Sequence, residues 1–292
     1  MPSIVGNNPL ISVGIPFYNN EDYLAYAIQS VICQSYENWE LILIDDGSND
    51  NSLQIAKNFA LKDKRIKVIY DGENKKLPYR LNQLINESIG EYIARMDADD
   101  IMHPDRLLTQ SMYLENNQSI DIVSSGLVSI DAQNNICGFR STSKIITNLS
   151  IDKGFPIIHP SVMARKEWYL RNLYDESYSR SQDYELWCRS FTNNDLKIAI
   201  LPDLLLFYRE FGNIDLTKLI KSYNNGYKIR EKYYLNNGID NFLKIKVKCL
   251  MVKLLSKLGL EQNLAKKRNR NFSSISEKQD YQSIVNNIVN NF

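Results

Sequence analysis

The sequence predicts a doubly wound α/β fold with a mixed sheet, followed by a basic helical region at the C-terminal end. Apolar strand-like runs alternate with helix-like segments over about the first 115 residues, as in chains whose helices cover both faces of one sheet. The charge changes sign near residue 214, and the segments beyond it have helical spacing. We therefore expect two regions, residues 1–212 and residues 213–292.

The first half of the α/β region consists of strand-then-helix units. Strands are expected where short Val-, Ile- or Leu-rich runs occur, and helices where apolar residues recur every three or four positions. In chain order, these are a strand at residues 10–16, a helix at 21–35, a strand at 39–44, a helix from Asp50 or Asn51 to about Leu61, a strand at 66–70, a helix at 78–88, a strand at 91–96 and a helix after Pro104.

The second half has a less regular pattern. The expected elements are strands at 121–130, 136–140 and 161–164, helices at 166–173 and 182–193, and two short strands at 197–201 and 204–209. Beyond Asp215 every segment is predicted to be helical, and Ser274 with Glu277 forms a possible capping box before the last helix.

Composition excludes several classes of site. The four cysteines are widely separated and form no CxxC pair, which argues against structural zinc and against a disulfide framework. The two histidines, His103 and His159, are too few for a histidine-rich metal site, and His103 is expected at the surface. The sequence has no basic-then-apolar leader and no uncharged run long enough to cross a bilayer, so we expect a cytoplasmic protein.

The distribution of charge points to a polyanionic partner. Residues 1–214 carry 20 basic and 28 acidic side chains, whereas residues 215–272 carry 14 basic and 4 acidic ones. The predicted helix at 242–258 has an apolar face, and lysines supply the rest of its surface. Such a helix could lie on the inner leaflet of the plasma membrane or pack against the α/β body. Because no nucleic-acid-binding motif accompanies the charge, we do not expect a nucleic-acid partner.

A pair of aspartates follows the strand predicted at 91–96. Side chains two positions apart on a strand project to the same side, so Asp97 and Asp99 can converge on one cation. Carboxylates with open coordination positions suit Mn²⁺ or Mg²⁺ bound to phosphate oxygens. The alternative is a solvated acidic turn that caps the next helix, and a cap is the role expected of Asp100.

Polar clusters also follow the other expected strands. Residues 16–18 end the first strand, Asp45 and Asp46 end the second, and the Asp97–Asp99 motif ends the fourth. In doubly wound sheets, ligands bind beyond the carboxyl ends of the strands. The three clusters are therefore expected at one edge of the sheet, around one ligand.

Four segments in this order resemble the signature of family 2 inverting glycosyltransferases. The segments are residues 11–19, 45–52, 90–100 and 182–187, and the resemblance covers roughly residues 10–211. It implies a GT-A fold for residues 1–212, a nucleotide-sugar donor, and a divalent cation. Bacterial members of this kind often build surface polysaccharides such as O-antigen, in lipopolysaccharide, or capsule, and their acceptors are often sugars on a polyprenyl diphosphate.

The resemblance implies a UDP-sugar donor and assigns residues to it. Tyr18 would stack on the uracil, with the Pro16 carbonyl nearby, and Asp45 would accept the imide N–H of the base. Asp46 would instead support the turn. Asp97 would meet the cation and the ribose, and Asp99 would be the firmer metal ligand.

The resemblance also assigns the general base to Asp183, which would deprotonate the acceptor hydroxyl. The family usually has a Glu before this Asp, where the chain has Gln182. Lys76 falls near a position where some members carry a basic nucleotide contact, although a solvated loop lysine is equally open, and Arg209 could contact the diphosphate. His159 matches a position near the acceptor cleft, although a structural role is equally open. Many members carry a further His where this chain has Phe211, so a third metal ligand there is not expected.

Together these features predict a metal-dependent hexosyl- or N-acetylhexosaminyltransferase, peripheral on the inner face of the membrane, with a polyprenyl-diphosphate-linked glycan as acceptor. One alternative is a nucleotidyltransferase, which would normally need a Gly-rich basic loop where residues 17–20 lie. The other is a non-catalytic, membrane-associated scaffold that binds sugar nucleotides.

Overall fold

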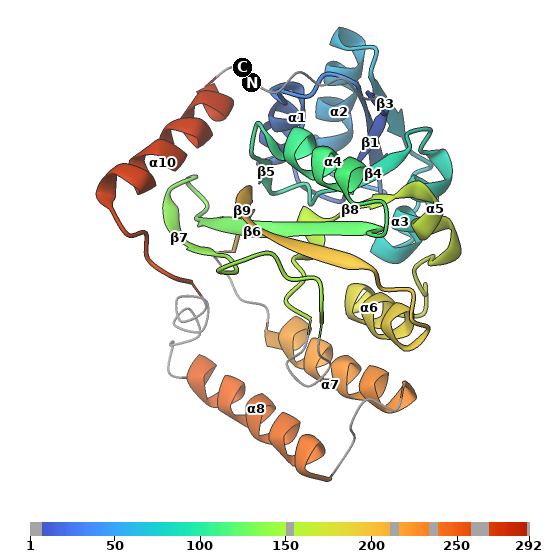
Figure 1. The fold of residues 1–292 in the computed structure, drawn as a ribbon, viewed down its shortest axis with the longest axis vertical. Coiled ribbons are helices and arrows are strands. Elements are labelled where there is room, and N and C mark those ends of the chain that lie inside the picture. Colours follow the sequence, from blue (N-terminus) through green and yellow to red (C-terminus); the bar gives the residue numbers. More distant parts are fainter. Residues whose placement is uncertain (1–7, 150–154, 211–215, 234–238, 258–268, 291–292) are drawn as a thin grey trace.

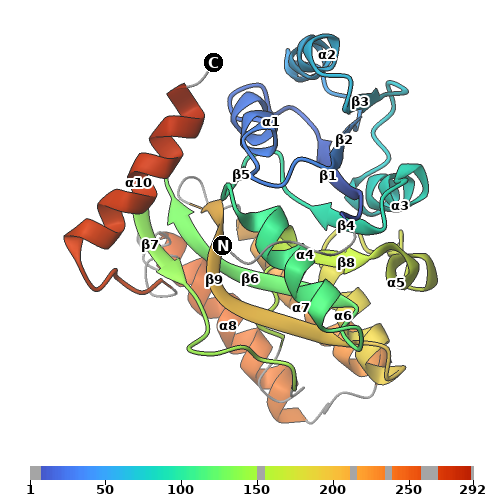
Figure 2. The same ribbon diagram turned by 45° about the horizontal axis from the view of Figure 1, so that its top comes forward.

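The protein folds around one mixed sheet with helices on both faces (Figure 1, Figure 2). The computed structural model describes residues 8–149, 155–210, 216–233, 239–257 and 269–290. Within these residues the strands follow the order β3-β2-β1-β4-β8-β6-β9-β5, and β7 pairs with β6. The predicted mixed α/β architecture is confirmed.

The first half of the sheet is parallel. It comprises β1 (Ile11–Phe17), α1 (Leu24–Ile32), β2 (Trp39–Asp45), α2 (Ser52–Lys62), β3 (Ile66–Ile69), α3 (Leu77–Glu87) and β4 (Tyr92–Arg95). Strand β1 pairs in parallel with both β2 and β4, so Ile11 lies opposite Trp39 on one side and Tyr92 on the other. The carboxyl ends of these strands therefore lie at one edge, as predicted.

The second half adds antiparallel pairs. It comprises β5 (Ile101–Met102), α4 (Arg106–Asn116), β6 (Ile122–Ile130), β7 (Ile136–Arg140), β8 (Met163–Arg165), α5 (Lys166–Arg171), α6 (Gln182–Thr192) and β9 (Ile198–Arg209). The expectation of two short strands at 197–201 and 204–209 was wrong. They form one strand, because a register shift opposite Gly126 accommodates Pro202 and Asp203.

Two apolar clusters lie on the two faces of the sheet. One packs β1 against α1, α2 and α4, through residues such as Val13, Ala27 and Leu107. The other packs the opposite face against α3, α5 and α6. Gly14 allows α3 to lie directly on β1, because a Cβ at this position would come within 2.0 Å of the Leu84 side chain.

Three helices follow the sheet: α7 (Leu216–Lys232), α8 (Ile239–Lys257) and α10 (Ile275–Asn290). One of the two hydrogen bonds of the capping box before α10 is confirmed, because Ser274 Oγ accepts the backbone N–H of Glu277 at 3.0 Å. Residues 213–215 and 258 lie outside the described residues. Among the described helices, none is long and apolar enough to cross a membrane.

Helix α10 returns to the body of the protein. Val285 and Ile288 are buried against Ile130 of β6 and Phe207 of β9. His103 was expected at the surface, but it is half-buried and stacks on Phe207 with ring centroids 6.1 Å apart. Its neighbours on α10 could not be foreseen, because they are almost 180 residues away in the sequence.

Candidate active site

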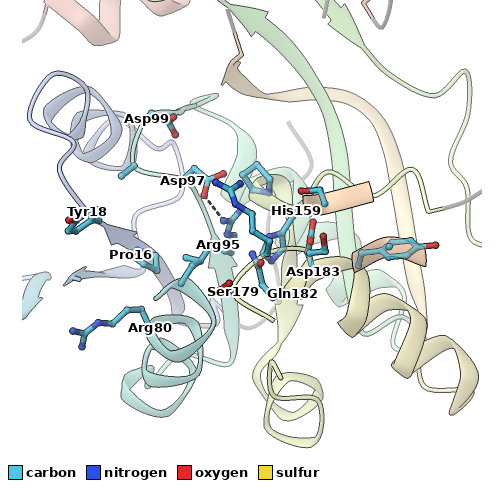
Figure 3. Close-up of a pocket in the computed structure, with 18 of the residues that line it drawn as sticks. Pro16, Tyr18, Arg80, Arg95, Asp97, Asp99, His159, Ser179, Gln182 and Asp183 are labelled. Atoms are coloured by element: carbon cyan, nitrogen blue, oxygen red, sulfur yellow. Dashed lines mark hydrogen bonds and ion pairs between the residues drawn. The ribbon is translucent and has the colours of Figure 1, made fainter. Parts of the chain in front are cut away.

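A cavity of about 930 Å³ lies at the carboxyl edge of the parallel strands. Its walls come from the end of β1, the turn after β4, the start of α6, and the helices α7 and α8. Figure 3 shows Asp97, Arg95, His159 and Asp183 gathered around its centre, with Pro16 and Tyr18 on one side. Segments far apart in the sequence thus meet at one cavity, as the strand-end clusters predicted.

One wall of the cavity is formed by the loop after β1. Pro16 and Tyr18 both line it, and the Tyr18 ring is 47% exposed, which leaves a face free for stacking. The loop is tied to the loop after β2, because the Asn19 N–H donates to Ser48 Oγ at 3.0 Å and the Asn20 N–H to Ser52 Oγ at 2.7 Å. These bonds fix the wall without using the side chain of Tyr18.

The two aspartates after β2 differ in their surroundings. Asp45 is buried, accepts the Ser48 N–H at 3.1 Å and is not among the residues that line the cavity. It lies opposite Phe17 in the β1–β2 register, next to the wall that carries Tyr18. Asp46 lines the cavity but supports the turn, because it accepts the Lys75 N–H at 2.7 Å and pairs with Arg80 at 2.9 Å.

Lys76 immediately precedes α3 and has a positive φ of 74°. Its N–H donates to Asp46, while its side chain is exposed and does not line the cavity. The described geometry therefore gives Lys76 a role in the backbone turn and shows no contact of its ammonium with the site.

Three carboxylates cluster in the turn after β4. One oxygen each from Asp97, Asp99 and Asp100 lies within 4.8 Å of the others, a spacing that suits one cation. Asp97 and Asp99 converge as predicted, but the predicted reason, that they lie on a strand, was wrong. Strand β4 ends at Arg95, and the turn that follows brings the two carboxylates together. The expected cap role of Asp100 was also wrong, because its buried carboxylate accepts the Arg209 N–H at 3.0 Å.

The mutual repulsion of these carboxylates favours binding of a cation. Burial, reinforced by the charge of Asp97, raises the pKa of Asp99 to about 6. Burial and the same neighbouring carboxylates raise the pKa of Asp100 well above its usual range. Crowded carboxylates repel one another, so a divalent ion between them would relieve that repulsion.

Two arginines hold this turn. Arg209 donates from Nε to the Asp99 carbonyl at 2.9 Å and from Nη2 to Asn134 Oδ1 at 2.7 Å, and it stacks on Tyr23. Arg209 does not line the cavity, so its guanidinium holds the turn in place and does not face the cavity. Arg95, which the sequence analysis did not single out, is 3% exposed, lines the cavity and pairs with Asp97.

Asp183 lies in the first turn of α6 and lines the cavity. Ser181 immediately precedes α6 and has a left-handed backbone conformation, with φ 63°. The helix starts there, and Asp183 in its first turn lies near Arg95 and Asp97 (Figure 3). Burial raises the pKa of Asp183, Arg95 lowers it and Asp97 raises it further. A carboxylate with a raised pKa that is open to a cavity is suited to accept a proton.

His159 lines the same cavity beside Asp183. Its Nε2 is 2.8 Å from the Tyr174 hydroxyl, and burial holds its pKa well below the usual range, so the ring is neutral. His159 therefore lines the cavity and also makes a structural hydrogen bond, so the two roles considered for it are compatible.

The far wall was not predicted. Ser222, Tyr223, Tyr227 and Arg230 of α7 line the cavity, together with Ile245 and Lys248 of α8. A Cβ on Gly226 would be 3.9 Å from the Tyr184 ring, so α7 packs closely beside the helix that carries Asp183. Nothing in the local pattern of residues 216–257 indicated this contact with the site.

Comparison with known proteins identifies the family. A model described as "Glycosyl transferase family 2" matches residues 12–173. The chain belongs to glycosyl transferase family 2. This finding confirms the resemblance and favours a glycosyltransferase over the nucleotidyltransferase alternative.

Two relatives have similar length and sequence. The Bacillus subtilis protein named "Putative glycosyltransferase EpsE" is 32% identical over 254 residues, which cover 86% of this chain and 85% of EpsE. An uncharacterised glycosyltransferase of Methanocaldococcus jannaschii is 36% identical over 209 residues, 70% of this chain and 71% of that protein.

Solved structures support the fold. The crystal structure of S. aureus TarS in complex with UDP-GlcNAc superposes with a TM-score of 0.62 at 18% identity, covering 82% of this chain and 71% of that one. TarS in complex with UDP gives a TM-score of 0.60 at 19% identity, with 82% and 70% covered. The expected GT-A fold is confirmed.

Proposed function

We propose that this glycosyltransferase is an inverting, metal-dependent enzyme that transfers a hexose or N-acetylhexosamine from a UDP-sugar to a glycan acceptor. The observation that carries the proposal is the single cavity lined by Asp97, Asp99 and Asp183. An inverting transfer needs one base on the acceptor side and compensation of the leaving diphosphate on the other. The UDP and UDP-GlcNAc complexes of the structural neighbour TarS support UDP as the nucleotide.

The nucleotide would bind along the wall after β1. Tyr18 has an exposed ring for the uracil, and the Pro16 carbonyl lies on the same wall. Asp45 lies at the end of β2 beside this wall and is the acceptor that we assign to the imide N–H of the base. Arg209 is not assigned to the diphosphate, because the hydrogen bonds of its guanidinium are made to the Asp97–Asp100 turn and to Asp131 and Asn134.

Asp97 and Asp99 would hold Mn²⁺ or Mg²⁺. The distances among their oxygens fit such an ion, and both side chains remain partly open to the cavity. When bound, the ion compensates the charge that develops on the departing UDP. Arg95 holds Asp97 in place by its ion pair, and Arg209 holds the backbone of Asp99.

Asp183 would act as the base. Its carboxylate takes the proton of the acceptor hydroxyl while that oxygen attacks the anomeric carbon from the side opposite UDP. The neutral His159 ring beside it adds no positive charge of its own that would weaken the base.

The acceptor that we propose is a sugar on a polyprenyl diphosphate, used in O-antigen or capsule synthesis at the inner leaflet. Support comes from α8, whose apolar residues Val247, Leu250, Met251 and Leu254 are each more than half exposed. These side chains project opposite Cys249 and Val252, which are buried, and the exposed Lys246 and Lys253 lie beside them. An apolar helix face bordered by lysines matches the surface of an anionic bilayer.

The test is UDP release from a panel of UDP-sugars with Mn²⁺ and an extract of polyprenyl-linked glycans. We expect one donor to be turned over by the wild type, and Asp183→Asn to reduce transfer by about 10²–10⁴-fold while UDP still binds. Unchanged turnover in Asp183→Asn would refute the base. Binding of UDP without turnover of any donor would instead favour the non-catalytic scaffold.

A further inference from the structure

The far wall of the cavity carries a second group of charged residues. Arg180 lies on the loop just before Asp183, and Arg230 and Lys248 come from α7 and α8. Figure 1 shows α7 and α8 on the side of the molecule away from β1, which leads into the wall proposed for the nucleotide. The basic residues of this wall therefore lie apart from the acidic turn at Asp97 and Asp99.

Most other basic side chains at the cavity are already paired. Arg80 is bound by Asp46 at 2.9 Å and by Asp71 at 2.6 Å, and Arg95 is bound by Asp97. The side chains of Arg180 and Lys248, in contrast, make no ion pair or hydrogen bond within the described part of the chain. A guanidinium and an ammonium that face a cavity without a counter-charge are suited to bind an anion.

The loop that carries Arg180 is held in place by α7. Asn225 Nδ2 donates to the Arg180 carbonyl at 3.0 Å, and Lys221 Nζ donates to Ser179 Oγ at 3.3 Å. These bonds fix the backbone of Arg180 and leave its guanidinium unused. Since Asp183 lies in the first turn of the next helix, the same contacts set the position of the Arg180 backbone relative to the base.

Helix α8 connects this wall to the proposed membrane face. Ile245 and Lys248 line the cavity, whereas Leu250 and Leu254 project outward from the same helix. An acceptor that reaches the cavity from a bilayer under α8 would pass Lys248 before its sugar reaches Asp183.

We propose that Arg180 and Lys248 form a subsite for a phosphate group of the acceptor, on the opposite side of Asp183 from the donor diphosphate. The inference rests on the proposed function, because it takes the Asp97–Asp99 turn as the donor side. The recognised chemistry is a phosphate ester or diphosphate, which a lipid-linked glycan or a free sugar phosphate could supply.

The experiment measures binding to the full chain preloaded with UDP and Mn²⁺. The two probes are farnesyl diphosphate, for the lipid source, and N-acetylglucosamine 1-phosphate, for the free sugar phosphate. We expect Arg180→Ala/Lys248→Ala to weaken binding of at least one probe by about tenfold or more, with UDP affinity changed less than about twofold. Arg180→Lys should recover part of the affinity, and Lys228→Ala, an exposed lysine of α7 away from the cavity, should have no effect.

The outcomes separate the two proposals. Loss of farnesyl diphosphate binding alone supports a lipid-linked acceptor, and an equal loss for both probes supports recognition of phosphate itself. Probe affinity equal to that of the wild type, or a parallel loss of UDP affinity, overturns the subsite. A wild type that binds UDP but neither probe also overturns it, whereas failure to bind UDP at all contradicts the proposed function.

Discussion

The pKa of Asp183 reflects burial and two charged neighbours, whose effects partly oppose one another. Burial at the start of α6 raises it, Arg95 lowers it, and Asp97 raises it further. A base must be ionised to accept a proton, so activity should be lost as the pH falls through this raised pKa. The acid limb of the rate profile should therefore lie above the pKa of an ordinary aspartate.

Replacing Arg95 should move that limb. In Arg95→Met the positive charge that favours the ionised form of Asp183 is removed, so the pKa of Asp183 rises and the acid limb shifts to higher pH. The measurement is kcat/KM for UDP release against pH, with circular dichroism as the control for folding, because the ion pair of Arg95 with Asp97 also bears on UDP affinity. An acid limb that stays in place, or that moves to lower pH, would contradict the assignment.

At the residue scale, the sequence predicted that Asp97, Asp99 and Asp183 share one site, but it placed Asp45 there as well, which does not line the cavity, and it did not show how the carboxylates are held. Asp97, Asp99 and Asp183 could be predicted because strand ends converge and because their segments resemble a family. Arg95 could not be singled out, since a basic residue in a strand is usually exposed, whereas this one is 3% exposed. Asp100 was taken for a helix cap because its bond to Arg209 spans 109 residues.

At the scale of elements, α10 is part of the core that supports the catalytic region. Its residues Val285 and Ile288 fill a cluster with Phe207 of β9, and β9 ends at Arg209, which holds the turn at Asp97–Asp100 by a hydrogen bond to the Asp99 carbonyl. The last helix and the site are thus connected through one strand. The boundary drawn at residue 212 separates regions by sequence pattern, while α10 contributes side chains to the α/β body.

Truncation of one α10 side chain should destabilise the protein. Ile288 is 2% exposed, so Ile288→Ala should lower the free energy of unfolding by about 2–4 kcal/mol, through lost burial and the cavity left behind. Ile275 on the same helix is 79% exposed, and Ile275→Ala should change stability by less than about 0.5 kcal/mol. Equal denaturation midpoints for the two variants in urea would show that α10 is not packed on the body.

Element boundaries were predictable where the pattern was local. The parallel strands and their helices follow from hydrophobic spacing, and most of their ends lie within a few residues of the predicted ones. Strand β5 has two residues, too few for any alternation to be seen. Strand β9 was divided in two because Pro202 and Asp203 interrupt the pattern, and only the pairing with β6 restores it.

At the scale of the whole molecule, the charge asymmetry corresponds to a spatial one. The acidic part of the chain forms the sheet and the turn with Asp97, Asp99 and Asp100, and the basic part forms α7 and α8, which lie away from β1 (Figure 1) and line the cavity. The sequence left open whether the apolar face of α8 packs on the body or faces a membrane. Since Val247, Leu250, Met251 and Leu254 are exposed, packing on the described body does not account for that face.

Binding to anionic vesicles should depend on this face. We expect Leu250→Ser/Leu254→Ser to reduce co-sedimentation with phosphatidylglycerol-containing vesicles by about tenfold or more, because two exposed leucine side chains that would insert into the lipid are replaced by polar ones. Leu61→Ser is a matched control, since Leu61 on α2 is 85% exposed and far from α8 in sequence. High salt should weaken wild-type binding as well. Equal sedimentation of the double variant and the wild type would reject the membrane face.

The most direct test of the account is UDP binding by isothermal titration calorimetry, with and without Mn²⁺, for the wild type and Asp99→Asn. The central claim is that the carboxylates of one turn hold UDP through a cation. The wild type should bind UDP at least about tenfold more tightly with Mn²⁺, and Asp99→Asn should lose most of that gain. Wild-type affinity that is the same with and without the ion, or a full gain retained in Asp99→Asn, would contradict the claim.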